Sequence, residues 1–270
     1  MVRARIVLAV GVLVTTLVAP AGAATTRTVA VDGAVAAPAT YSLAQLAALP
    51  QTTYPHGVTG VGLESLVQRS APTLPAGKNT QLRVILTVTG RDHRAESFAL
   101  GELDPDFGNQ AAALTVGRTV DLVVIGDRAR DIRDVTEIRV AVSDAAARTA
   151  APGSVVVVTP HRTVTLPAAL LARLPRRTVT VTFLAGTASQ THTESGPPLS
   201  LALLAAGVLQ RTVVAVGSDG YGAAVTLNEN RPLLLSMVED GAKLAQPRLI
   251  ADGDVKGGRY VSNVVVLQVS

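Results

Sequence analysis

The sequence contains no cysteine among its 270 residues. This absence excludes disulfide bonds, a cysteine nucleophile and thiolate ligands for a metal. The fold must therefore be held by the burial of apolar side chains, which come from a hydrophobic fraction of 48%. Aromatic residues amount to only 3% of the chain, which argues against a surface that stacks nucleic-acid bases.

The chain also lacks a cluster of basic residues. It has 24 basic and 20 acidic residues, a net charge of +4, and this mild excess gives no reason to expect a nucleic-acid partner. After residue 23, no run of about 20 residues is free of polar side chains, as a membrane span requires. The longest candidate, residues 199–216, is interrupted by Gln210 and Arg211. We therefore expect no stable membrane span once the N-terminal segment is removed.

Residues 1–23 have the features of a secretory signal peptide. Arg3 and Arg5 precede an apolar run over residues 6–18, and Ala21-Gly22-Ala23 has the small-x-small pattern of a cleavage site. A membrane anchor is the alternative reading, but the apolar run is shorter than the ~20 residues that a span needs. Ala4 separates the two arginines, so the twin-arginine pattern is missing. The sequence predicts a secreted or extracytoplasmic protein exported by the general route.

The remaining sequence contains an internal repeat. Aligning Asp92 with Asp219 also aligns, without a gap, the pairs Gly90 and Gly217, Leu100 and Leu227, Glu102 and Glu229, and Pro105 and Pro232. Residues 145–153 are small and end in Pro-Gly, as in a linker. We therefore predict a first module over residues 28–143, a linker over 144–154 and a second module over 155–270. Two domains of about 120 residues each are of ordinary size.

Local patterns predict short elements within each module. Residues 213–227 have the pattern of a strand, a tight Ser-Asp-Gly-Tyr turn and a second strand. Ser42 is the expected N-cap of a short helix, and a second helix is expected over residues 63–70. Residues 186–196 are polar and are expected to be irregular. The predicted fold class is α+β, with short helices packed on modules that are mostly β.

The order of signals in the second module resembles that of a known family. The signals are Leu171-x-x-Leu174-Pro175, Gly196-Pro197-Pro198-Leu199, Ser218-Asp219-Gly220-Tyr221, Asn228-Glu229 and Lys256-Gly257-Gly258-Arg259-Tyr260-Val261. In this order they are similar to the sulfite-oxidase-like molybdopterin-binding domain family, and the first module resembles it more loosely. The resemblance implies two tandem mixed α/β modules of that type. Family enzymes ligate molybdenum through a cysteine thiolate, which this chain lacks. No cofactor is therefore expected, and molybdopterin is the one that the resemblance would imply.

Three segments carry candidate ligand-binding residues. Asp219 and Tyr221 lie in the turn of the second module, and Asp92, His93 and Arg94 lie in the matching turn of the first. Turns between strands often carry function, although Asp-Gly also suits an ordinary tight hairpin. The loop Lys256-Gly257-Gly258-Arg259 has the composition to present backbone N–H groups and two cations to an anion. Its alternative reading is a surface turn. No catalytic residues and no metal-ligand set are predicted.

The sequence supports three hypotheses about function. The first is a secreted, non-catalytic binding or interaction protein whose partner is an extracellular small molecule or protein. The alternative is a molybdopterin-dependent oxidoreductase of the sulfite oxidase type that binds its cofactor without a cysteine, which requires a cationic pocket around Lys256 and Arg259. The third is a structural pair of modules that displays an interaction surface. A concave pocket with convergent polar groups would favour a ligand-binding role over the third hypothesis.

Overall fold

A computed structural model describes residues 27–270, so the signal peptide expected over residues 1–23 lies outside the described residues. Strands account for 45% of the structure and helices for 16%. The expected α+β class is therefore wrong, and the fold is mostly β. The physical reason is that the helical patterns hold for only one or two turns. Helix α1 (Leu43–Ala47) buries Leu46 alone, so it cannot form a layer of its own.

The first half of the chain forms two sheets. The five-stranded sheet has the order β2-β1-β9-β5-β6, with β1 (Thr28–Gly33), β2 (Ala39–Ser42), β5 (Val84–Gly90), β6 (Ala95–Ala99) and β9 (Val135–Val142). The four-stranded sheet has the order β3-β4-β7-β8, with β3 (Thr52–Thr53), β4 (Thr59–Gly62), β7 (Ala112–Val116) and β8 (Val120–Val124). The remaining helices of this half are α2 (Leu63–Arg69), α3 (Leu100–Leu103) and the 3₁₀ turns η1 (Pro55–Gly57), η2 (Thr80–Arg83) and η3 (Arg128–Arg130).

The second half also forms a five-stranded and a four-stranded sheet. The first has the order β11-β10-β18-β14-β15, with β10 (Val155–Val158), β11 (Thr163–Leu166), β14 (Thr212–Gly217), β15 (Gly222–Thr226) and β18 (Val264–Val269). The second has the order β12-β13-β16-β17, with β12 (Arg177–Ala185), β13 (Ala188–Gly196), β16 (Leu233–Glu239) and β17 (Ala242–Ala251). The helices are α4 (Ala168–Leu171), α5 (Leu199–Ala205) and the 3₁₀ turn η4 (Gly257–Arg259).

The two halves have the same strand topology. In the first, β1 is antiparallel to β2 and parallel to β9, and in the second, β10 is antiparallel to β11 and parallel to β18. The remaining neighbours in each five-stranded sheet are antiparallel, and the four-stranded sheets are antiparallel throughout. One local prediction is wrong: residues 188–196 form the long strand β13, paired along its whole length with β12.

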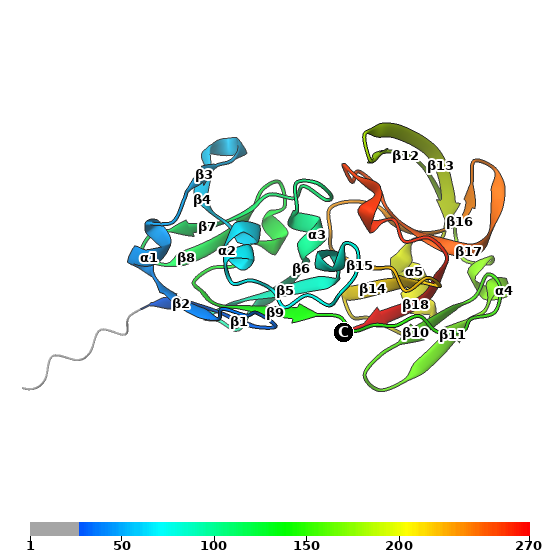
Figure 1. Cartoon of the computed structure of the whole chain (residues 1–270), viewed down its shortest axis with the longest axis horizontal. Coiled ribbons are helices and arrows are strands. Elements are labelled where there is room, and N and C mark those ends of the chain that lie inside the picture. The colour runs from blue at the N-terminus through cyan, green and yellow to red at the C-terminus, as the bar shows by residue number, and fades with distance from the viewer. Residues whose placement is uncertain (1–26) are drawn as a thin grey trace, which may run out of the picture.

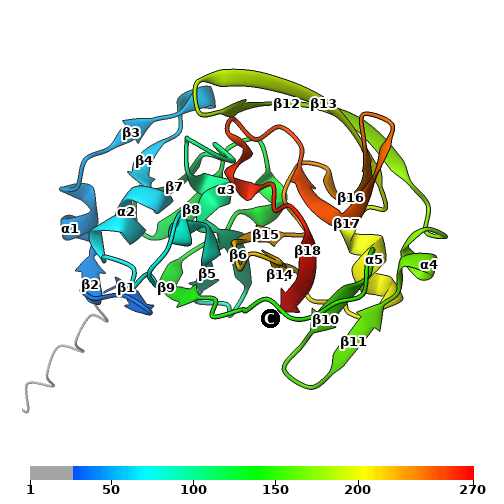
Figure 2. The same cartoon turned by 45° about the vertical axis from the view of Figure 1, so that its right-hand side comes forward.

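The two halves lie side by side along the long axis of the molecule, and each has its own apolar core (Figure 1). The separation is not complete, because Leu82 and Phe107 of the first half belong to the core of the second. A small third cluster, which includes Ile85, Ala99 and Val214, packs strands of the two five-stranded sheets together. The β12–β13 hairpin arches over η4 (Figure 2), and the backbone N–H of Leu184 in the hairpin donates to the carbonyl of Val255. Loops from both halves of the chain thereby surround one pocket.

Candidate functional site

A pocket of about 660 Å³ lies where the two halves meet. The first half contributes residues in and just before η2 and after α3, namely Lys78, Asn79, Gln81, Asp104, Asp106 and Phe107. The second half contributes the end of the β12–β13 hairpin, the β14–β15 turn and the segment around η4, namely residues 183–186, Asp219, Tyr221, Lys256, Gly257, Gly258, Tyr260 and Ser262. This volume is typical of a small-molecule site.

Aromatic side chains are concentrated at this pocket. The chain has three phenylalanines, four tyrosines and no tryptophan, and four of these seven residues line the pocket: Phe107, Phe183, Tyr221 and Tyr260. The rings of Phe183 and Tyr260 meet edge to face, with centroids 4.6 Å apart and an interplanar angle of 68°. Aromatic rings supply large, rigid contact surfaces for a ligand. Their concentration here, in a chain with few aromatic residues, makes this pocket the candidate ligand-binding site.

Gly257 and Gly258 are explained by the close approach of two of these rings. A Cβ atom on Gly257 would lie 2.6 Å from Cδ2 of Phe183, and one on Gly258 would lie 2.2 Å from Cε1 of Phe107. Both distances are far shorter than van der Waals contact, so no larger residue fits without moving a ring. The two glycines therefore allow the two phenylalanines to pack onto the backbone of η4.

Tyr221 ties the two halves together at the pocket wall. Its hydroxyl donates to the carbonyl of Gly258 and accepts a hydrogen bond of 3.3 Å from the side-chain amide of Asn79. The carboxylate of Asp219 shapes the turn by accepting from the backbone N–H of Tyr221 at 3.0 Å. Gly220, with a φ of +82°, supplies the left-handed conformation that this turn requires. Burial raises the pKa of Tyr221, so its hydroxyl stays protonated.

Tyr260 lines the pocket and has a buried hydroxyl without a partner in residues 27–270. The side chain is 9% exposed, and its buried hydroxyl has no hydrogen-bond partner among the described residues. Burial, followed by the charges of Asp254 and Asp252, raises the pKa of this phenol. The hydroxyl therefore remains a donor at neutral pH. A buried polar group without a partner is rare in folded proteins and calls for an explanation such as a ligand or an ordered water.

The charges on the lining are mixed, with a small negative excess. Three carboxylates, on Asp104, Asp106 and Asp219, face two ammonium groups, on Lys78 and Lys256. The ammonium of Lys256 pairs with the carboxylate of Asp106 at 2.8 Å, which neutralises one cation. The pocket is consequently polar and is not cationic.

Arg259, the fourth residue of the predicted loop, does not reach this pocket. Its guanidinium is fully buried and pairs with both oxygens of Glu229, at 2.8 and 2.9 Å, and with both oxygens of Asp254, at 2.8 and 2.6 Å. Burial lowers the pKa of Arg259, but the charges and hydrogen bonds of Glu229 and Asp254 together outweigh it and raise the pKa above its ordinary value. The stem of Arg259 packs against Gly101 of the first half, where an added Cβ would lie 3.1 Å from its Cδ.

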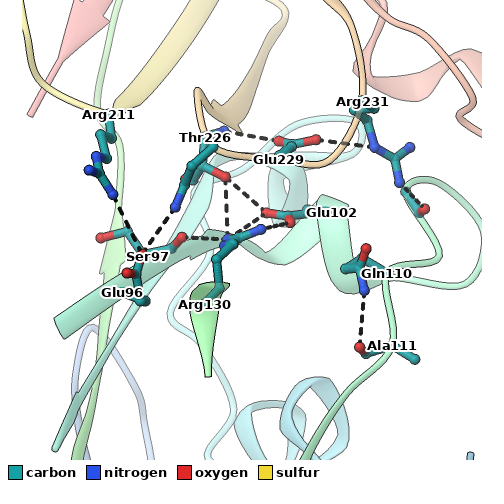
Figure 3. Close-up of polar contacts among 12 residues, drawn as sticks. Glu96, Ser97, Glu102, Gln110, Ala111, Arg130, Arg211, Thr226, Glu229 and Arg231 are labelled. Atoms are coloured by element: carbon teal, nitrogen blue, oxygen red, sulfur yellow. Dashed lines mark hydrogen bonds and ion pairs between the residues drawn. The ribbon is translucent and has the colours of Figure 1, made fainter. Parts of the chain in front are cut away.

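The buried charges continue across the interface between the halves. Arg231 pairs with Asp254 at 2.7 Å and also donates to the carbonyl of Gly108. Figure 3 shows Thr226 between Glu229 and the pair of Glu102 and Arg130. Three arginines and three acidic residues thus form one connected cluster, consisting of Arg130, Arg231, Arg259, Glu102, Glu229 and Asp254. Such clusters are costly to break because each charge is desolvated.

The predicted residues of the first module lie elsewhere. Asp92, His93 and Arg94 form the β5–β6 turn, outside the inter-half pocket. The turn copies that of the second half: Asp92 accepts from the backbone N–H of Arg94 at 3.0 Å, as Asp219 does from Tyr221. Arg94 also lies 3.6 Å from Glu96. The structure therefore brings together Asp219, Tyr221, Lys256, Gly257 and Gly258, and it separates them from the turn of the first half.

Several lining residues were missed by sequence reasoning. Phe107, Phe183 and Tyr260 carried a usable signal, because aromatic residues are scarce enough in this chain for each one to be considered. Lys78, Asn79 and Asp104 carried none, since their approach to the second half depends on the packing between the halves. Among residues 27–270, no three His, Asp or Glu side chains are grouped so that they could hold a metal. In the same residues, no helix has the length and apolar character of a membrane span.

The lining does not fit molybdopterin, the cofactor implied by the family resemblance. That pterin carries a phosphate, which requires cationic or N–H donors that face it. Here carboxylates outnumber ammonium groups, and Arg259 is committed to Glu229 and Asp254. The chain also has no cysteine to complete the metal's ligand set.

Comparison with known proteins gives distant similarities at the level of structure. No protein-family model matches the chain, and no curated protein matches it. Among solved structures, the sulfane dehydrogenase SoxCD from Paracoccus pantotrophus is similar over 43% of this chain, with 19% sequence identity and a TM-score of 0.37. The aligned part covers 38% of that protein's chain.

Proposed function

We propose that the chain is a secreted, non-catalytic protein that binds a small polar ligand, neutral or positively charged, between its two halves. The observation that carries this proposal is the convergence of four of the seven phenylalanine and tyrosine residues on one pocket. The partner is an extracellular small molecule. Two modules, residues 28–143 and 155–270 joined by the linker 144–154, would supply the two walls, and their common strand order supports a duplication.

The polar groups of the lining favour this class of ligand. Asp104 and Asp219 offer carboxylate oxygens, and the lining residue Tyr260 has a buried, protonated hydroxyl without an acceptor among the described residues. Ring faces and carboxylates together suit the hydroxyl and C–H groups of a sugar or the charge of an amine, since cations are attracted to aromatic faces. An anionic ligand would have to overcome the excess of carboxylates. Both lining tyrosines have raised pKa values, so they suit hydrogen bonding better than proton abstraction.

The test is a binding measurement with compounds that differ in charge. Thermal unfolding of the secreted protein would be followed with maltose, spermidine and glucose 6-phosphate, and any binder would be titrated by calorimetry. We expect a neutral or cationic compound to raise the melting temperature, as a ligand of the native state must. Stabilisation by glucose 6-phosphate alone, or by none of the three, would count against the proposal.

The variant Tyr260→Phe locates the site. It removes a hydroxyl that has no protein partner, so the stability of the free protein should be unchanged or slightly higher. Binding should weaken by about tenfold, which corresponds to one lost hydrogen bond of about 1.4 kcal/mol. Tyr41→Phe is the matched control, because Tyr41 packs against the core of the first half, away from the pocket. If Tyr260→Phe and Tyr41→Phe bind the ligand equally well, the inter-half pocket is not the binding site.

A further inference from the structure

A second pocket, of about 590 Å³, lies within the second half of the molecule. One wall comes from the predicted linker at Pro152 and Gly153 and from the segment around α4, and the other comes from β16 and β17. It shares no lining residue with the inter-half pocket. Its volume is within the range of about 300–1,000 Å³ that small-molecule sites occupy.

The body of this second pocket is apolar. Ala168, Ala169 and Ala172 form one side, and Met237 and Leu244 form the other. Met237 is 5% exposed and sits at a register shift between β16 and β17. Bulges of this kind redirect a side chain and are common beside functional sites. Methionine is also flexible enough to adapt its shape to an aliphatic ligand.

The wall formed by the linker is fixed to the sheet. The backbone N–H of Gly153 donates to the carbonyl of Ala245 and to the side-chain oxygen of Gln246, both at 2.9 Å. The side-chain amide of Gln246 in turn donates to the carbonyl of Ala151 at 3.1 Å. Gly153 has a φ of +71°, and a Cβ there would lie 3.0 Å from that of Ala168. These hydrogen bonds hold the linker against β17, so the pocket is preformed. The small size of Gly153 and Ala168 allows the linker and α4 to pack closely.

All the charge on the lining is positive. Arg176 and Lys243 are the charged residues among those that line the pocket, and the lining includes no carboxylate. Among the described residues, neither side chain makes an ion pair or a hydrogen bond. By contrast, Arg248, on the same strand as Lys243, pairs with Glu194 at 3.1 Å and with Glu239. Two exposed cations without partners thus flank an apolar cavity.

We infer that this pocket binds an aliphatic carboxylate, a medium-chain fatty acid. The chain would be buried against alanine, methionine and leucine side chains, with a gain of about 0.8 kcal/mol for each buried CH₂ group. The carboxylate would be held by Arg176 and Lys243, whose bonds to an ionised acceptor are stronger than neutral ones. This inference is independent of the ligand proposed for the inter-half pocket.

The experiment uses dodecanoate, dodecanol and acetate, each below the concentration at which it aggregates, with calorimetric titration of the whole secreted protein. We expect dodecanoate to bind with one-to-one stoichiometry, dodecanol to bind at least tenfold more weakly, and acetate not to bind. Equal binding of dodecanoate and dodecanol would overturn recognition of the carboxylate. Failure of dodecanoate to saturate a single site would overturn the whole inference.

Two sets of variants locate the binding. Arg176→Gln combined with Lys243→Gln should weaken dodecanoate at least tenfold and leave dodecanol unchanged, whereas Arg173→Gln, an exposed neighbour outside the lining, should change neither. Ala169→Trp should fill the cavity and abolish binding of both compounds. Ala169 is exposed, so this variant is expected to fold, and its thermal unfolding checks that. Unchanged dodecanoate binding by Ala169→Trp would place the ligand elsewhere and overturn the inference.

Discussion

The hydroxyl of Thr226 donates a hydrogen bond to the carboxylate of Glu102 over 3.0 Å, although 124 positions separate the two residues. The backbone N–H of Thr226 also donates to Glu229 at 2.9 Å. Glu102 is paired with Arg130 in the first half, and Glu229 is paired with Arg259 in the second. Thr226 therefore joins the buried ion pairs of the two halves.

Replacing Thr226 by valine should uncouple the two sets of ion pairs. Valine keeps the shape of the side chain but removes one of the two donors to Oε2 of Glu102 in a buried site, where Arg130 remains as the other donor at 3.3 Å. The free energy of unfolding should fall by about 1–3 kcal/mol, measured by urea denaturation. Thr182→Val is the control, because its hydroxyl meets that of Thr191 in an exposed position. Equal stability of the two variants would contradict the role given to Thr226.

Removing the charge of Arg259 should lower the free energy of unfolding more than Thr226→Val does. Arg259→Met fills much of the same space but leaves Glu229 and Asp254 buried without their main partner. We expect a loss of about 3–5 kcal/mol, as for other broken buried pairs. Arg139→Met, which removes an exposed residue 3.7 Å from Glu137, should cost about 0–1 kcal/mol. Similar denaturation midpoints for the two variants would show that the cluster contributes little.

The buried cluster also predicts a dependence of stability on pH. Burial raises the pKa of Glu229 from 4.5 to about 7, against the opposing charge of Arg259. The folded state then holds this proton more tightly than the unfolded state does. The contribution of Glu229 to the free energy of unfolding should therefore rise as the pH falls from above 7 towards 4.5, by an amount on the order of 3 kcal/mol.

The variant Glu229→Gln isolates this contribution because it cannot titrate. Urea denaturation of both proteins at about pH 5 and about pH 8 gives the difference in stability between them at each pH. The stability of the natural protein relative to Glu229→Gln should be higher at about pH 5 than at about pH 8. A constant difference would mean that the pKa of Glu229 is not raised in the folded state.

Local features of the fold were predictable from local sequence. The expected N-cap at Ser42 is confirmed, with a capping box in which Ser42 and Gln45 bond to each other's backbone N–H. The expected strand-turn-strand of the second half is confirmed as β14 and β15, in register across five residue pairs. In both cases the decisive interactions lie within a few residues of one another, so composition and spacing are enough.

Features that depend on distant partners were not predictable. Strand β13 carries mainly polar residues because much of it is exposed beside β12, so it lacks the apolar alternation that marks a strand. The sequence presented Arg259 as a loop cation, whereas Glu229, 30 positions away, and the nearby Asp254 hold it in the interior. For the pocket, the sequence indicated the turn and the glycine loop but not the wall from the first half.

Gly258 gives the sharpest test of how the inter-half pocket is built. Gly258→Ala would place a Cβ 2.2 Å from the ring of Phe107, whereas Gly117→Ala would meet no atom closer than 4.0 Å. Overpacking at the first site should lower the free energy of unfolding by about 1–3 kcal/mol and displace Phe107 into the pocket, so that ligand binding also weakens. Gly117→Ala should change neither property. Combining Gly258→Ala with Phe107→Leu should restore part of the lost stability, because the shorter side chain makes room for the added methyl group. If Gly258→Ala unfolds at the same urea concentration as Gly117→Ala, the contact between Phe107 and the glycine loop does not set the shape of the pocket.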